Sequence, residues 1–151
     1  MKFISLLLII AFGSFGLRSQ NCNDLFISAY LEGASNDKAI EIYNPTASSI
    51  SLDGYKIRRY TNGSTSPTTI AFTSGATIAA NDVYIVAHSS GNAGLLAVAD
   101  QTTGSMTHNG DDAIALYNGT SNIDVVGVIG VDPGSSWTAV SYTHLTLPTI
   151  E

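Results

Sequence analysis

The sequence predicts an all-β domain built as an antiparallel β-sandwich. About eight to ten short runs alternate apolar and polar residues, the pattern of strands that bury one face. Clusters of Gly, Asn, Asp, Ser and Pro separate these runs about every ten residues and indicate turns. Almost no stretch has helical periodicity. A small β-barrel is the alternative that the same pattern allows.

The clearest strand signals lie in residues 38–60. The run Lys38–Asn44 alternates so that Ile40 and Ile42 are expected to face the core, and Pro45 ends this strand because it has no N–H to donate. The stretch continues with a brief strand Ser49–Leu52, a tight turn Asp53-Gly54 and a strand Tyr55–Tyr60. Together these runs predict a β-meander.

Further elements are expected on both sides of this meander. The first strand is Asp24–Gly33, with Leu25, Ile27, Ala29 and Leu31 as the expected core face and Phe26, Ser28 and Tyr30 on the other face. The later strands are Thr69–Phe72, Ala76–Ala79 and Val83–His88, followed by a hairpin of Ala113–Tyr117 and Ile123–Ile129. Between them, Ala93–Ala99 is expected to form a short helix or 3₁₀ segment and Gly104–Gly110 to be irregular.

The N-terminus predicts a secretory signal peptide over residues 1–19. Lys2 precedes the apolar run Phe3–Phe12, which only Ser5 interrupts, and small residues follow it. This run is shorter than the roughly 20 apolar residues that a membrane-spanning helix needs. Cys22 is the sole cysteine, so no internal disulfide can form. We therefore expect a protein that is secreted, periplasmic or at the cell surface, and that does not span the membrane after cleavage.

The C-terminal residues 140–151 are interpreted as a non-native tail. Val140–Thr149 matches a sequencing adapter translated in one frame, so the domain is assigned to residues 20–139 and is expected to continue beyond them in a longer natural chain. Without Lys2, Arg18 and Glu151, the 6 basic and 12 acidic residues become 4 and 11, a net charge of −7. A net-acidic domain is not drawn to nucleic acid by its overall field.

Sequence motifs for catalysis are missing, since the chain has no phosphate-binding loop, no nucleophile elbow and no zinc-ligand spacing. One constellation could hold a divalent metal for phosphodiester hydrolysis, namely His108, Asp111 and Asp112, with His88 as a further histidine. The alternative is that Asn109–Asp112 is a turn whose carboxylates cap loop amides.

A second candidate site is the basic strand of the meander. Alternation places Lys56, Arg58 and Tyr60 on one face, and an exposed Lys-Arg-Tyr face could bind phosphates or stack a base or sugar. The alternative is a solvated face whose charges discourage pairing of strand edges. Trp137 is either a ligand platform or a plug that closes one end of the sandwich.

Five segments carry a resemblance to a known family: Leu25–Gly33, Lys38–Thr46, Leu52–Tyr55, Val83–His88 and Gly110–Tyr117. In this order they resemble the lamin tail domain, in the form found in secreted bacterial proteins, and Glu-Ile-Tyr-Asn-Pro with Leu-x-Gly-Tyr is the specific part. The resemblance implies an immunoglobulin-like β-sandwich without catalytic residues or cofactor. It also implies that the final strands of the family, which follow Gly134–Trp137, are missing.

The functional prediction is a non-catalytic binding or scaffolding module of a secreted or cell-surface bacterial protein. Its partner could be a protein, a glycan or a nucleic acid. The main alternative is a nucleic-acid-binding accessory domain of a secreted metal-dependent nuclease or phosphoesterase, which would use Lys56, Arg58 and Tyr60. Two further alternatives are a metal phosphodiesterase centred on His108, and calcium-assisted glycan binding, which rests on analogy between folds.

Overall fold

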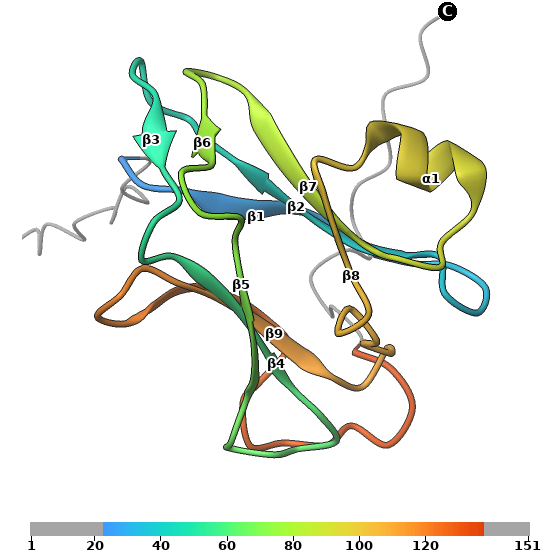
Figure 1. Ribbon diagram of the computed structural model, residues 1–151. Coiled ribbons are helices and arrows are strands. Elements are labelled where there is room, and N and C mark those ends of the chain that lie inside the picture. The colour runs from blue at the N-terminus through green and yellow to red at the C-terminus, as the bar shows by residue number, and fades with distance from the viewer. Residues whose placement is uncertain (1–22, 138–151) are drawn as a thin grey trace, which may run out of the picture.

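The computed structural model describes residues 23–137, which fold into two packed sheets (Figure 1). The elements are β1 (Phe26–Glu32), β2 (Lys38–Tyr43), β3 (Ile50–Ser51), β4 (Lys56–Tyr60), β5 (Thr68–Ala71), β6 (Thr77–Ile78), β7 (Val83–His88), α1 (Ala93–Val98), β8 (Gln101–Thr103), β9 (Ala113–Tyr117) and β10 (Asn122–Val126). The predicted signal peptide 1–19 and the predicted tail 140–151 lie outside the described residues. Within the described part, no helix is long and apolar enough to cross a membrane.

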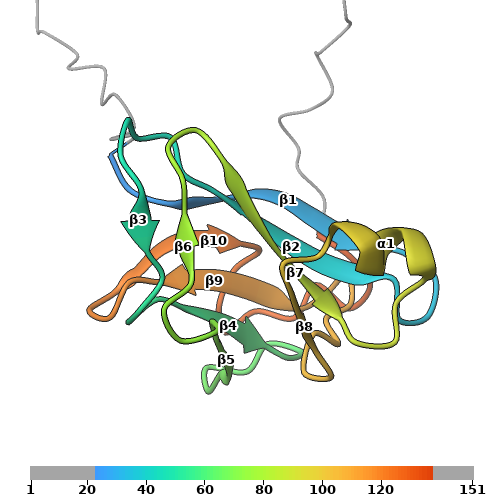
Figure 2. The ribbon, with the colours of Figure 1, turned by 45° about the horizontal axis from the view of Figure 1, so that its top comes forward.

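The strands form a sandwich, which confirms the predicted all-β, immunoglobulin-like fold class. The first sheet has the order β1-β2-β7-β8 and the second sheet the order β10-β9-β4-β5, while β3 and β6 form a separate pair. Figure 2 shows the sheets as two layers, with α1 beside β7. All pairings are antiparallel except that of β7 with β8. The short polar strand β8 was missed because it has no apolar alternation.

The core lies between the sheets, and the alternation of β2 and β9 directs its largest side chains. Ile40 and Ile42 are fully buried, as predicted. They pack with Ile57, Ile114 and Leu116 of the second sheet in one cluster. Burial of such side chains is the main favourable term in folding, at roughly 1.5–3 kcal/mol each.

Asn44 explains why an Asn-Pro pair ends β2. Its buried side-chain amide donates hydrogen bonds to the carbonyl oxygens of Ser48, Ile78 and Ala79, at 2.8, 3.1 and 2.9 Å. Its Oδ1 accepts from Thr46 N at 3.0 Å. One side chain thus satisfies the backbone of the turn and ties it to the end of β6.

The predicted core face of β1 was wrong after Ile27. Ser28 is an extra residue opposite β2, because Ile27 pairs with Ile42 and Ala29 pairs with Glu41. This β-bulge reverses the alternation. Tyr30 consequently packs against the core, whereas Ala29 and Leu31 lie on the outer face of the first sheet.

Side chains bridge the sheets at both sides of the sandwich. At one side, Asp124 Oδ2 of β10 accepts a hydrogen bond from Ile27 N of β1 at 2.8 Å. At the other, Gln101 Nε2 of β8 donates to Ala71 O of β5 at 2.9 Å, and Gln101 Oε1 accepts from Thr73 N at 2.9 Å. These bonds occupy edge groups that would otherwise be open to strand pairing.

Candidate functional site

The basic strand β4 does not present the exposed face that its sequence predicts. Tyr60 is only 4% exposed, so the prediction of an exposed tyrosine was wrong. The guanidinium carbon of Arg58 lies 3.4 Å from the centre of the Tyr117 ring, and Arg58 Nη1 donates to Asn122 Oδ1 at 3.3 Å. Of the three predicted ligand residues, Lys56 is exposed, Arg58 is half-buried and Tyr60 is buried.

The segment after β10 covers this face. Ile129 packs against Tyr60, Ala113 and Ala115, which form a second apolar cluster. Farther along, Trp137 Nε1 donates to Asp112 O at 3.0 Å. Trp137 is half-buried over Gly127, where an added Cβ would lie 2.6 Å from Trp137 Nε1. This geometry fits the interpretation of Trp137 as a plug rather than a ligand platform.

The metal candidates His108, Asp111 and Asp112 are placed near one another but face different partners. His108 is fully buried, and its Nε2 donates to Leu31 O at 2.9 Å. Asp112 accepts hydrogen bonds from Asn62 N at 3.1 Å and Asn109 N at 3.4 Å. Among the described residues, no group of three or more histidine, cysteine or acidic side chains is arranged to hold a metal ion. The described residues therefore supply no set of ligands for the predicted metal site.

Charge and burial explain what these groups do instead. Asp112 is 1% exposed in its side chain and lies 3.5 Å from Arg59 Nη1, so the carboxylate is compensated by an ion pair. Burial lowers the pKa of His108, with Lys38 adding to this shift and the Leu31 carbonyl, Glu32 and Asp112 opposing it. His88 is also buried, and its Nδ1 accepts from Ser90 N at 3.0 Å. These contacts are those of turns and a largely hydrogen-bonded interior, in which His108 Nδ1 and Asp111 Oδ1 are buried without a hydrogen-bond partner among the described residues.

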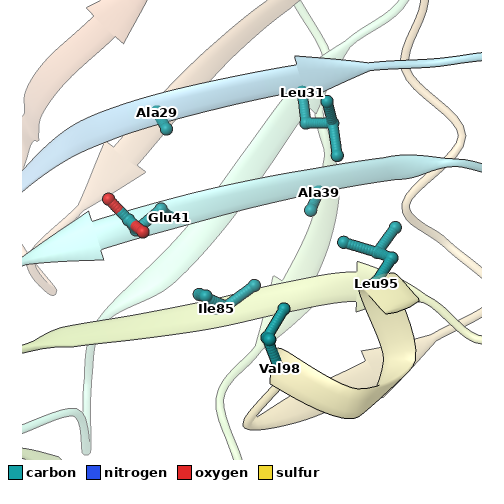
Figure 3. Close-up of a pocket in the computed structure, with 7 residues that line it drawn as sticks. All are labelled: Ala29, Leu31, Ala39, Glu41, Ile85, Leu95 and Val98. Atoms are coloured by element: carbon teal, nitrogen blue, oxygen red, sulfur yellow. The ribbon is translucent and has the colours of Figure 1, made fainter. Parts of the chain in front are cut away.

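The described residues contain an apolar groove on the outer face of the first sheet, beside α1 (Figure 3). Its lining residues come from β1, β2, β7 and α1: Ala29, Leu31, Ala39, Glu41, Ile85, Leu95 and Val98. Figure 3 shows Leu31 on one side, Leu95 and Val98 on the other, and Ala39 between them. The groove has a volume of about 250 Å³.

Local structure accounts for each wall of this groove. The bulge at Ser28 turns Ala29 and Leu31 outward. The other wall depends on Asn92, whose Oδ1 accepts from Leu95 N at 3.0 Å as the N-cap of α1. Asn92 N also donates to Asp37 Oδ1 at 2.7 Å, and hydrogen bonds from Asn92 lower the pKa of Asp37. The helix is thereby fastened to the turn between β1 and β2.

Comparison with known families agrees with this architecture. The model of the lamin tail domain matches residues 18–130. The chain belongs to the lamin tail domain family. No curated protein matches the sequence. The lamin tail domain is a non-catalytic, immunoglobulin-like module, which agrees with the two-sheet sandwich described above.

Sequence reasoning missed the groove of this lamin tail domain. Leu31 was assigned to the core because strict alternation was applied through Ser28, and no sequence rule locates a bulge in a strand of this composition. One signal was present in the sequence. Leu95 and Val98 lie on a six-residue helix, which has no means of burying apolar side chains by itself. Such a helix must place its apolar side chains against a neighbour, here the first sheet.

Proposed function

We propose that this lamin tail domain is a non-catalytic binding module that takes a protein partner on the outer face of its first sheet. The observation that carries the proposal is the exposed apolar groove. Leu31 is 43% and Val98 59% exposed, and they line the same hollow. Apolar side chains gathered in one hollow, rather than scattered singly, favour an interaction site, because leaving them in water is unfavourable.

The size of the groove favours a protein over a small molecule. Pockets for small ligands have volumes of roughly 300–1,000 Å³ and enclose most of the ligand. The groove, at about 250 Å³, falls below that range. It suits one or two apolar side chains that anchor a larger partner lying across the surrounding sheet.

A peptide-display selection tests this proposal. The purified chain is immobilised and random peptides are selected, then rebound to Val98→Asp and to Val125→Asp. Val125 is the matched control, since it is exposed at 39% and lies outside the groove on β10. We expect peptides to retain binding to Val125→Asp and to lose it on Val98→Asp. Equal binding to both variants, or no selected peptide, would refute the proposal.

The proposed location is outside the bacterial cytoplasm, in the medium, in the periplasm or at the cell surface. Support comes from Lys2 and the apolar run Phe3–Phe12, which have the composition of an export signal. The whole chain, expressed in a bacterium, should be recovered outside the cytoplasm with a mass that corresponds to cleavage near Ser19. An uncleaved cytoplasmic product would contradict this part of the proposal.

A further inference from the structure

The groove carries one charged side chain in its lining, Glu41 of β2. Figure 3 shows the carboxylate at the end of the groove remote from α1. Its Oε1 accepts a hydrogen bond from Ser28 Oγ at 2.7 Å. Within residues 23–137, no basic side chain forms an ion pair with Glu41. Lys38, on the same strand, pairs with Glu32 at 3.6 Å.

The position of this carboxylate is a direct result of the bulge. Without the bulge, the register of Phe26–Tyr43 and Ile27–Ile42 would continue, so Ala29 would lie opposite the core residue Ile40 and the β1 side of the groove would be lost. With it, Ala29 faces Glu41 across the strand pair, and the Ser28 hydroxyl orients the carboxylate. An oriented carboxylate at the edge of apolar surface is an acceptor for a charged donor.

We infer that the groove binds a partner segment that combines an aliphatic side chain with a lysine or arginine. The aliphatic side chain lies over Ala39 between Leu31 and Val98, and the cation of the segment binds the Glu41 carboxylate. This inference rests on the proposed function and names the partner of that site. The excess of 11 acidic over 4 basic residues in the domain also favours a basic partner through long-range attraction.

Two capped peptides test the inference, acetyl-Leu-Leu-Lys-amide and acetyl-Leu-Leu-Gln-amide. Each is titrated into the purified chain while backbone amide shifts are followed by NMR. We expect both peptides to move the amides of Ala39, Glu41 and Leu95. The lysine peptide should bind more tightly, by up to about fivefold, because an exposed ion pair contributes roughly 0–1 kcal/mol.

Three variants separate the contribution of the Glu41 charge to peptide binding from that of the apolar groove. Glu41→Gln keeps the size of the side chain and removes its charge, so it should abolish the preference for lysine and leave the glutamine peptide unaffected. Ala29→Leu fills the groove from an exposed position and should weaken the binding of both peptides. Val125→Asp, outside the groove, should change neither titration.

The outcomes distinguish this inference from the proposed function. If Val98→Asp removes peptide binding but wild type and Glu41→Gln show the same lysine preference, the groove is a binding site and the inference about its partner is wrong. If neither peptide moves the groove amides, the inference is overturned, and the display selection decides the proposed function separately. If wild type self-associates in sedimentation and Val98→Asp is monomeric, a second copy fills the groove and the inference is also overturned.

Discussion

The outer faces of the two sheets differ in what covers them. On the second sheet, the segment after β10 lies over the strands, and Tyr60 is 4% exposed. On the first sheet, Leu31 is 43% exposed beside a helix that covers only part of the face. The outer faces of both sheets carry apolar side chains, but the segment after β10 covers the outer face of the second sheet.

This difference shows that the surface chemistry of strands does not by itself identify a binding site. The cations of β4 looked like a ligand surface, yet Arg58 stacks on Tyr117 and Arg59 pairs with Asp112. Both guanidinium groups therefore have partners within the protein. The first sheet looked less informative because its apolar residues were assigned to the core. What remains uncovered after folding is the better guide to binding.

The largest expected effect concerns the buried ion pair of β4. Arg59→Ala leaves Asp112 buried without its counter-charge, and removal of one partner from such a pair costs about 3–5 kcal/mol. We expect a loss of about 3 kcal/mol in the free energy of unfolding, measured with urea. Lys56→Ala, on the same strand but exposed, is the control and should change stability by less than about 0.5 kcal/mol. Equal losses would show that the two cations do not differ in role.

A smaller loss is expected from opening the cover of the second sheet. Gly127 has φ +85°, and an added Cβ would lie 2.6 Å from Trp137 Nε1. Gly127→Ala should therefore lower stability by about 2–3 kcal/mol, from backbone strain of about 1–2 kcal/mol and displacement of the indole. Gly75→Ala is the matched control, since φ is +76° and the space around it is open. If both variants lose the same amount, Trp137 does not pack on Gly127 in solution.

Sequence reasoning was most successful where alternation is unbroken. In β2, residues 39–43 pair with residues 83–87 of β7 without a register shift, so Ile40 and Ile42 face the core as predicted. The Glu-Ile-Tyr-Asn-Pro motif of the family could also be recognised, because Asn44 and Pro45 are neighbours in the sequence. Strand alternation and the family motif both concern residues close together in the chain, and a single sequence is informative at that range.

The candidate site could not be predicted, because it depends on contacts between distant segments. Next to the bulge at Ser28, Ile27 N donates to Asp124, which lies 97 residues from Ile27 in the sequence. Burial of Tyr60 depends on Ile129, which follows the last strand. Neither contact leaves a mark in the local pattern. The predictions for Leu31 and Tyr60 therefore failed for the same physical reason.

Acid should weaken the interior beneath the groove. His108 Nε2 bonds the carbonyl of Leu31, and burial lowers the pKa of His108 below its ordinary value of about 6.5. The unfolded chain therefore binds this proton at a higher pH than the folded chain does. Stability should fall as the pH drops below about 6.5, by at most about 1.4 kcal/mol per pH unit for one proton.

Urea unfolding between pH 7 and pH 5 measures this slope, and His108→Gln should flatten it. The imidazole signals of the wild type, followed by NMR, provide a second measurement that does not depend on the stability of the variant. A folded-state His108 that titrates above about 6.5 would contradict the expected direction.

The smallest effect is expected for nucleic acid, and it tests whether the covered face retains any ligand role. A lysine or arginine that contacts phosphate releases counterions, so each one lost should reduce the salt slope of binding by about 0.9. Arg58 instead stacks on Tyr117, a contact that contributes about 0.5–1 kcal/mol to stability. We therefore expect Arg58→Ala to lower stability by that amount. Neither this variant nor Lys56→Ala should change the fluorescence anisotropy of a labelled DNA duplex at low salt. Binding that weakens in both variants, with a reduced salt slope, would instead support the accessory nucleic-acid role and make the second sheet a functional face as well.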